Sequence, residues 1–174
     1  MTHTRTDLSE TDLRHLERCV QLAEEALRAG DEPFGSLLVS ADGEVLAEDR
    51  NRVHSLDDAT KHPEIELAHW ARAHLTPQQR AAATVYTSGE HCPMCSAAHG
   101  WLGLGRIVYA HSAAQLADWL AELGVPDGPV RCLPIEDVVP GLPVQGPAPG
   151  LAGRMRELHH RFRTMRRTGP QAAG

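Results

Sequence analysis

The sequence has few aromatic residues, no long apolar run and only four cysteines. Aromatic residues make up 4% of the chain, so we expect a core built mostly of leucine, valine, isoleucine and alanine. No run of about 18 apolar residues occurs, which argues against a membrane span. Residues 1–7 contain no apolar segment of the kind that a signal peptide needs. These absences favour a cytoplasmic protein that does not bind membranes.

The cysteines are too few and too unevenly spaced to form a disulfide framework. Cys92 and Cys95 lie three positions apart, a spacing typical of metal ligation in a reducing cell interior. Cys19 and Cys132 stand alone, and we expect both to be buried, unreactive thiols. The cysteine pattern therefore indicates a metal site and, again, the cytoplasm.

The chain is acidic, with a formal net charge of -6 over 174 residues. Such a balance provides no general field to attract nucleic acid, whose binding depends on neutralising phosphates. A basic cluster near the C-terminus is expected to form the solvated face of a helix. Its members are Arg154, Arg156, Arg161, Arg163, Arg166 and Arg167. A small molecule is therefore the expected partner, and nucleic acid is not.

Hydrophobic periodicity and turn residues predict one domain, 1–174, with a core between about residues 10 and 166. Helices are expected between Ser9 and Gly30, over 63–74, 93–101 and 112–123, and along the apolar stripe from Leu151 to Met165. Strands are expected over 35–40, 44–48, 83–87 and 106–110, with a weaker one over 130–134; residues 140–150 are expected to form a loop and 168–174 to be disordered. This order indicates an α/β fold in which helices cover both faces of one sheet.

Two short segments place metal-ligating side chains at the start of predicted helices, namely His62-Pro63-Glu64 and Cys92-Pro93-Met94-Cys95. Two thiolates and one imidazole are three protein ligands, which leave a tetrahedral zinc ion one position for water. Zinc lowers the pKa of such a water to about 7. Glu64 can lie beside that water without binding the ion and can shuttle protons. This arrangement is the signature of zinc deaminases, and Glu64 is the predicted catalytic residue.

A structural zinc site is the alternative interpretation of the same residues. Cys92 and Cys95 could bind zinc together with His91 or His99, which would leave His62 as an ordinary surface histidine. That interpretation needs four protein ligands, because structural zinc sites are usually closed.

At these residues the chain resembles the guanine deaminase and tRNA adenosine deaminase branch of the cytidine-deaminase-like superfamily. The similarity covers about residues 10–125 and lies in the segments 33–35, 58–64, 86–95 and 105–109 and at Asn51. The resemblance implies a three-layer α/β/α sandwich with a central mixed five-stranded sheet. It also implies one Zn²⁺ per chain and a homodimer or larger assembly.

The resemblance assigns further residues to the substrate pocket. Asn51 matches an asparagine that hydrogen-bonds the substrate ring, and Phe34 matches a position that lines the pocket. A turn residue and plain core packing are the respective alternatives. Trp119 lies in a region that closes over the substrate in relatives. From their positions in the sequence alone, we expect Glu90 to orient the site or the substrate or to make a structural hydrogen bond, and Trp101 to lie in the core or at a subunit interface.

Two departures from the family pattern border the predicted pocket. Pro63 stands where the family usually has alanine, and its ring adds bulk and removes an N–H donor. His91 stands where proline is common. Neither change affects a metal ligand or Glu64, so both bear on the substrate and not on the chemistry.

The expected function is that of a zinc-dependent hydrolytic deaminase acting on an amino-bearing nucleobase or nucleoside. A guanine-type purine is the first choice, with cytosine, cytidine and triazine analogues as further candidates. One alternative is a tRNA adenosine-to-inosine deaminase, for which the C-terminal arginines are the support in this sequence. Another is a non-catalytic zinc-binding module, which would require Glu64 to be dispensable.

Overall fold

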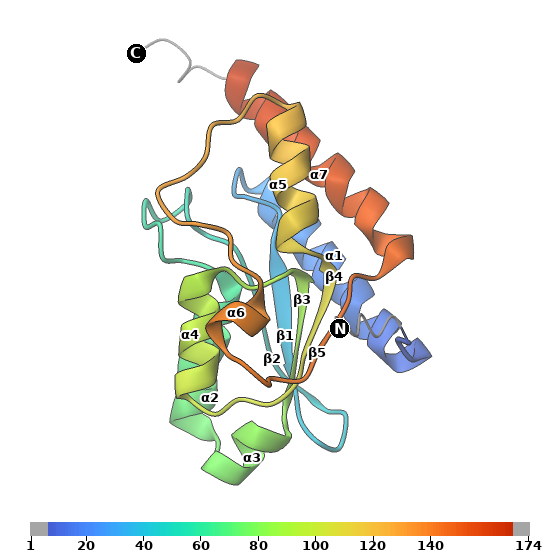
Figure 1. The fold of residues 1–174 in the computed structure, drawn as a ribbon, viewed down its shortest axis with the longest axis vertical. Coiled ribbons are helices and arrows are strands. Elements are labelled where there is room, and N and C mark those ends of the chain that lie inside the picture. The colour runs from blue at the N-terminus through green and yellow to red at the C-terminus, as the bar shows by residue number, and fades with distance from the viewer. Residues whose placement is uncertain (1–6, 169–174) are drawn as a thin grey trace.

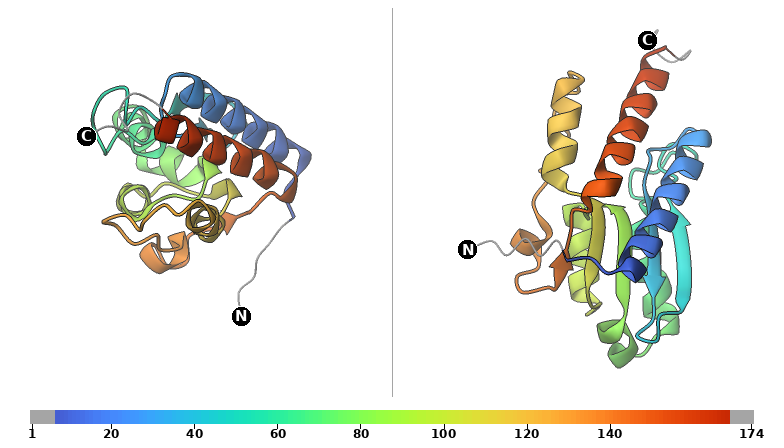
Figure 2. Two further views of the ribbon diagram at one scale, coloured as in Figure 1. Left: turned by 90° about the horizontal axis from the view of Figure 1, so that it is seen from above. Right: turned by 90° about the vertical axis from the view of Figure 1, so that its right-hand side faces the viewer.

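The computed structural model describes residues 7–168, in which a five-stranded sheet lies between two layers of helices (Figures 1 and 2). The strands are β1 Gly35–Val39, β2 Val45–Arg50, β3 Thr84–Gly89, β4 Ile107–His111 and β5 Val144–Gln145. They lie in the order β2-β1-β3-β4-β5. β1 is antiparallel to β2 and β3, whereas β3, β4 and β5 are parallel. The sheet is therefore mixed, as the resemblance implied.

Helices cover both faces of this sheet, which confirms the three-layer architecture (Figure 2). The helices are α1 Glu10–Arg28, α2 Pro63–His74, α3 Pro77–Ala82, α4 Pro93–Trp101, α5 Ala113–Glu122, α6 Ile135–Val138 and α7 Pro149–Thr168. One layer contains α1 and α7, with α5 packed against α7, and the other contains α2 and α4 in contact with each other. The two layers enclose separate apolar clusters on the two faces of the sheet.

The α1 layer approaches the sheet very closely because of one glycine. A Cβ atom on Gly35 would lie 2.3 Å from Leu22 Cβ and 2.6 Å from the Cys19 carbonyl oxygen, so no larger residue fits without moving the helix. The adjacent Phe34 is thereby held at the start of β1. The metal-ligating segments lie at the end of the sheet where β1 starts and where β3 and β4 finish.

The sequence-based prediction is wrong at the fifth strand. Residues 130–134 form no strand, and the chain there runs as a loop into α6. The fifth strand is instead β5, within the segment 140–150 that was expected to be a loop. β5 has only two residues at the sheet edge, too few for an alternating hydrophobic pattern to be visible. The helix α3, capped by Thr76, was also not predicted.

Two side chains expected to be inside are exposed. Cys19 is buried as predicted, but Cys132 is exposed on the loop before α6. Trp101 is 90% exposed at the end of α4, so its predicted place in the core is wrong, while its alternative role at a subunit interface stays a prediction.

The disorder predicted for 168–174 falls outside the described residues, apart from position 168, where α7 ends. Between residues 7 and 168, none of the helices combines the length and the apolar character that crossing a membrane requires.

Candidate metal centre and active-site cavity

The two metal-ligating segments both lie at helix N-termini. His62 is the N-cap residue of α2 and Cys92 is the N-cap residue of α4, and each is followed by a proline in the first turn. Proline suits this position because the N–H that it lacks has no intrahelical partner there. Because α2 packs against α4, the two N-termini meet, and Cys95 joins them from the first turn of α4.

The donor atoms of His62, Cys92 and Cys95 fit a tetrahedral zinc ion. The three atoms lie within 4.8 Å of one another, and His62 Nδ1 is 3.6 Å from Cys92 Sγ and 3.8 Å from Cys95 Sγ. Zn–N and Zn–S bonds of about 2.0 to 2.3 Å at tetrahedral angles separate neighbouring donors by roughly 3.5 to 3.8 Å. The side chains are therefore already spaced as zinc ligands.

The histidines of the alternative structural site are placed differently. The His99 Nε2 atom lies 2.7 Å from the Gly105 carbonyl oxygen, with which it forms a hydrogen bond. His91 is buried and stacks edge-on against His99. The geometry thus favours His62 as the third donor beside Cys92 and Cys95. These three donors would leave the fourth position of a tetrahedral ion without a side chain from the set.

Cys92 is held as a thiolate by its surroundings. Hydrogen bonding from the Cys95 thiol, assisted by His62, lowers the pKa of the Cys92 thiol to about 4 despite its burial. The N-terminus of α4 adds a partial positive charge beside the sulfur. A thiolate is the form that binds zinc, and Cys92 is already in that form, whereas Cys95, whose hydrogen bond with Cys92 raises the pKa of its thiol, loses a proton when metal binds.

The Glu64 carboxylate lies next to the donor group with its two oxygens in different surroundings. The hydroxyl oxygens of Ser36 and Thr87 are 3.1 and 3.0 Å from Glu64 Oε1. The Cys95 Sγ atom is 3.7 Å from Glu64 Oε2. Burial raises the pKa of Glu64, which brings the carboxyl group closer to the range in which it can exchange protons at neutral pH.

A cavity opens beside the metal-ligating side chains and Glu64, at one end of the strands. It is lined by Phe34, His62, Glu64, Glu90, Cys92, His111, Ala113, Leu116 and Cys132. The cavity lies at the carboxyl ends of the parallel strands β3 and β4, the usual position of ligand sites in α/β sheets.

The other predicted pocket residues lie around this cavity, and their roles stay predictions. Asn51 donates its N–H to the Phe34 carbonyl at 3.0 Å, and its side-chain oxygen accepts from the Val53 N–H at 3.0 Å. That second bond supports the turn role for Asn51. Pro63 is buried in the first turn of α2, and Trp119 is buried behind the cavity wall. Within the described residues, none of these three lines the cavity.

Glu90 lines the cavity, but its carboxylate is occupied by the main chain. One oxygen accepts the Ala113 N–H at 2.7 Å, and the other accepts the Ile135 N–H at 2.9 Å. These bonds hold the starts of α5 and α6 against the cavity. The geometry therefore supports the structural role that the sequence left open.

Sequence analysis missed four of the lining residues, namely His111, Ala113, Leu116 and Cys132. One signal was available for His111, because it ends a strand parallel to the strand that precedes the cysteines, and such ends meet at one edge. The other three come from α5 and from an irregular loop, which carry no such signal.

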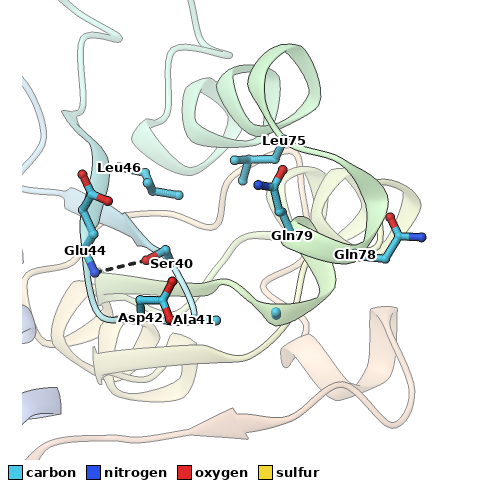
Figure 3. Close-up of a pocket in the computed structure, with 9 residues that line it drawn as sticks. Ser40, Ala41, Asp42, Glu44, Leu46, Leu75, Gln78 and Gln79 are labelled. Atoms are coloured by element: carbon cyan, nitrogen blue, oxygen red, sulfur yellow. Dashed lines mark hydrogen bonds between the residues drawn. The ribbon is translucent and has the colours of Figure 1, made fainter.

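A second hollow lies away from the metal-ligating group, between the β1–β2 turn and α3 (Figure 3). Its wall includes Ser40, Glu44, Leu46, Leu75 and Gln79, and the Glu44 N–H donates to Ser40 Oγ at 3.1 Å. It contains none of the predicted site residues, so we assign no role to it.

Comparison with known proteins identifies the class to which this fold and site belong. The family model of the cytidine and deoxycytidylate deaminase zinc-binding region matches residues 9–111. This match includes the three donor residues and Glu64, and the chain belongs to this family. It is accordingly an enzyme of the hydrolytic deaminase class, and the family description supports a zinc-binding site at the donor group.

Three of the curated relatives are deaminases with different substrates. The chain is 34% identical over 111 residues to a probable cytosine deaminase of Schizosaccharomyces pombe. The aligned region covers 64% of this chain and 67% of the relative. It is 36% identical over 104 residues to the guanine deaminase of Bacillus subtilis, covering 59% and 66%. It is 36% identical over 88 residues to a tRNA-specific adenosine deaminase of Agrobacterium fabrum, covering 49% and 57%. The chain thus spans between about half and two thirds of the length of these relatives.

Solved structures agree with this fold. The guanine deaminase from Bacillus subtilis superposes with a TM-score of 0.55 at 30% identity, covering 77% of this chain and 83% of that one. The guanine deaminase from Nitrosomonas europaea superposes with a TM-score of 0.64 at 18% identity, covering 90% and 87%. The second likeness is one of fold alone.

Proposed function

We propose that this chain is a zinc-dependent deaminase that releases ammonia from a small amino-bearing nucleobase or nucleoside. A guanine-type purine is the first choice, and cytosine, cytidine and triazine analogues follow. The observation that carries the proposal is the grouping of His62, Cys92 and Cys95 beside the Glu64 carboxylate. Three donors leave a tetrahedral zinc ion one position for water, as in catalytic sites.

The chemistry divides between the metal and Glu64. Zinc, when bound by His62, Cys92 and Cys95, supplies activation of water at neutral pH. Glu64 is held at Oε1 by two hydroxyl groups, so its Oε2 is the atom that moves protons: it passes one proton of the water to the ring nitrogen and then the second to the departing amine. Over the whole reaction a C–O bond forms from water, the C–N bond of the amine breaks, and ammonia leaves.

The charges around the cavity support an uncharged substrate. Within residues 7–168, no lysine or arginine lines the cavity, whereas Glu64 and Glu90 do. Apart from the metal site itself, a phosphate group would find no lysine or arginine there and would meet two carboxyl groups. A free base or nucleoside therefore suits the cavity better than a nucleotide. The named activity of the guanine deaminase relative supports a purine base.

A tRNA substrate is the second candidate, supported by the named activity of the tRNA-specific relative. Extruding an RNA base requires cationic contacts to the flanking phosphates. Three of the C-terminal arginines already pair with carboxylates of the same chain, namely Arg154, Arg156 and Arg163. These pairs reduce the positive charge of α7 and favour the small-molecule substrate.

We also propose that the chain forms a homodimer and is located in the cytoplasm. The exposed Trp101 at the end of α4 is our candidate for the subunit interface, because a large exposed apolar side chain often marks one. Reduced thiols at Cys92 and Cys95, which zinc binding requires, suit the cytoplasm.

The experiment is a substrate panel assayed for ammonia release by the zinc-loaded protein. The panel contains guanine, cytosine, cytidine, adenosine, an aminotriazine and an adenosine-containing anticodon stem–loop RNA, with Glu64→Gln as the matched blank. We expect release from guanine or a related aminopurine, and none with the variant. If none of the compounds reacts while the protein contains one zinc per chain, the proposal is wrong. If only the RNA reacts, the second candidate is correct.

A further inference from the structure

Two buried histidines lie beside the cavity with ring nitrogens that lack a partner of normal hydrogen-bond geometry among the described residues. His111 is 1% exposed and His159 is 2% exposed, and their rings pack edge to face with centroids 5.1 Å apart. Among the described residues, three of their ring nitrogens make no hydrogen bond of normal geometry. They are both nitrogens of His111 and the Nε2 of His159. The Ser88 main chain lies near the His111 ring and raises the pKa of His111 against the larger effect of burial. Buried polar atoms normally have partners, so these nitrogens call for an explanation.

His111 lies in the cavity wall, whereas His159 lies behind it. His111 is the last residue of β4 and pairs in register with Gly89 at the end of β3. A Cβ atom on Gly89 would lie 2.7 Å from His111 Cε1 and 2.8 Å from Phe34 Cε1, so the glycine leaves the space that both rings occupy. The same wall includes Glu64 and Cys92, which brings the His111 ring and the metal-ligating group to one cavity.

Aromatic neighbours hold the His111 ring in place. The ring centroid of Trp119 lies 5.1 Å from that of His111, and the ring centroid of Phe34 lies 6.0 Å away. Phe34 also packs edge-on against His159 at 4.9 Å. These side chains come from the start of β1, from α5 and from α7, so three separate elements fix one imidazole at the cavity.

The His111 imidazole is uncharged at neutral pH. Burial lowers the pKa of His111 to about 4, and burial also lowers the pKa of the adjacent His159. The Glu90 carboxylate, also in the cavity wall, already accepts two main-chain N–H groups. A neutral imidazole offers one N–H donor and one nitrogen acceptor. That combination matches the edge of an uncharged heterocycle and provides no positive charge for a phosphate.

We propose that His111 is a substrate-binding residue that hydrogen-bonds the heterocyclic base at an edge other than the one bearing the departing amine. The inference rests on the proposed function, since it takes the base as the occupant of the cavity. Phe34 then provides an apolar ring surface beside the base, while Trp119 and His159 act as positioning residues. A base with a complementary N–H group or ring nitrogen is preferred over one that lacks it, because a buried donor or acceptor left unpaired weakens binding.

The test measures binding separately from catalysis. Zinc-loaded protein carrying Glu64→Gln is titrated with guanine and 8-azaguanine, and the titration is repeated after adding His111→Phe or His111→Gln. We expect His111→Phe to weaken binding by about 10- to 100-fold and His111→Gln to recover part of the loss. Zinc content and the melting temperature of each variant show whether the fold and the metal site are intact.

A second measurement does not depend on the variants folding. The wild-type protein, labelled with ¹⁵N-histidine and loaded with zinc, is titrated with 8-azaguanine. The ring nitrogens of His111 should shift, whereas those of His99, whose Nε2 already bonds the Gly105 carbonyl, serve as the control.

The outcomes separate this inference from the proposed function. If bases bind and react but His111→Phe binds them as well as before, or the His111 resonances do not move, His111 is a structural residue and the inference is wrong. If the zinc-loaded wild-type protein neither binds nor deaminates any base, the proposed function fails first, and the inference fails with it.

Discussion

Glu64 differs from an ordinary buried carboxylate because its two oxygens have separate partners. Oε1 is within hydrogen-bonding distance of Ser36 and Thr87, while Oε2 faces Cys95. Fixing one oxygen leaves the other in a defined position beside the metal-ligating group. This asymmetry is what a proton shuttle requires, because the accepting atom must be placed before it can act.

Glu64→Gln should retain zinc and fold while losing turnover. The amide keeps the size of the side chain and can still pair with Ser36 or Thr87, but it cannot accept and return a proton. We expect kcat to fall by about 10²- to 10⁴-fold, the usual contribution of general acid–base catalysis. Steady-state kinetics and metal analysis check this together. Near-normal turnover by a zinc-loaded variant would contradict the role of Glu64.

Cys92 and Cys132 are the matched pair for testing the metal ligands, because both thiols line the cavity but only Cys92 belongs to the donor group. Cys92→Ser should lose zinc and lower the melting temperature by about 5 to 10 °C, because metal binding is linked to folding. Cys132→Ser should keep one zinc per chain. Loss of zinc from Cys132→Ser would show a fourth protein ligand and would contradict an open coordination position.

At the scale of elements, the start of α1 is tied to the sheet by one carboxylate. Asp12 accepts hydrogen bonds from Ser9 in the capping box, from Tyr86 of β3 and from Arg106 beside β4. Burial alone would raise the pKa of Asp12, but the bonds from Arg106, Ser9 and Tyr86 outweigh it and hold that pKa well below 3.8. The helix is thereby anchored to the two strands whose ends form the cavity.

The stability that Asp12 contributes should depend on pH. The unfolded chain takes up the Asp12 proton near its ordinary pKa of 3.8, whereas the folded protein takes it up only at lower pH. The contribution is therefore complete above about pH 5 and is lost as the pH falls toward the folded-state pKa. Asp12→Asn should lower the unfolding free energy by about 2 kcal/mol at pH 7, and less below pH 4.

Denaturant unfolding at several pH values checks this prediction. Glu10→Gln, an exposed acidic residue in the same first turn, is the control and should change the unfolding free energy by less than about 0.5 kcal/mol. A loss for Asp12→Asn that is the same at pH 3 and pH 7 would show that its carboxylate is not the stabilising group.

The elements that carry the candidate metal ligands could be predicted from the sequence, because each combines a proline in the first turn with a candidate ligand at the N-cap. The pairing of the two segments in space also followed from the family resemblance. β5 could not be predicted, since two edge residues between Pro143 and Gly146 show no periodicity. The place of His111 could be predicted only in part. A strand parallel to β3 brings its last residue to the same end of the sheet, but the contact with the cavity also depends on the register between β3 and β4 and on the absence of a side chain at Gly89.

At the scale of the whole molecule, the positive charges of α7 are balanced by other helices. Arg154 pairs with Glu17 and Glu24 of α1, and Arg156 pairs with Glu122 of α5. These contacts are exposed, so each adds little to stability. Their effect is on partners, since they make the C-terminal helix less attractive to phosphates.

Substitution of Trp101 tests where the subunits of the proposed dimer meet. A tryptophan that is 90% exposed in the single chain has a large apolar surface that association could bury. If it lies in the subunit interface, Trp101→Lys should shift the protein from dimer to monomer in sedimentation analysis. Met165→Lys, on the exposed part of α7, is the control and should leave the dimer intact. A dimer that survives Trp101→Lys would place the interface elsewhere.

Zinc K-edge X-ray absorption on the purified protein tests the central claim most directly. The account predicts one zinc per chain, bound by two sulfur atoms at about 2.3 Å and two light atoms at about 2.0 Å, of which one belongs to an imidazole. A protein without stoichiometric zinc, or a zinc ion closed by a third sulfur or a second imidazole, would contradict it.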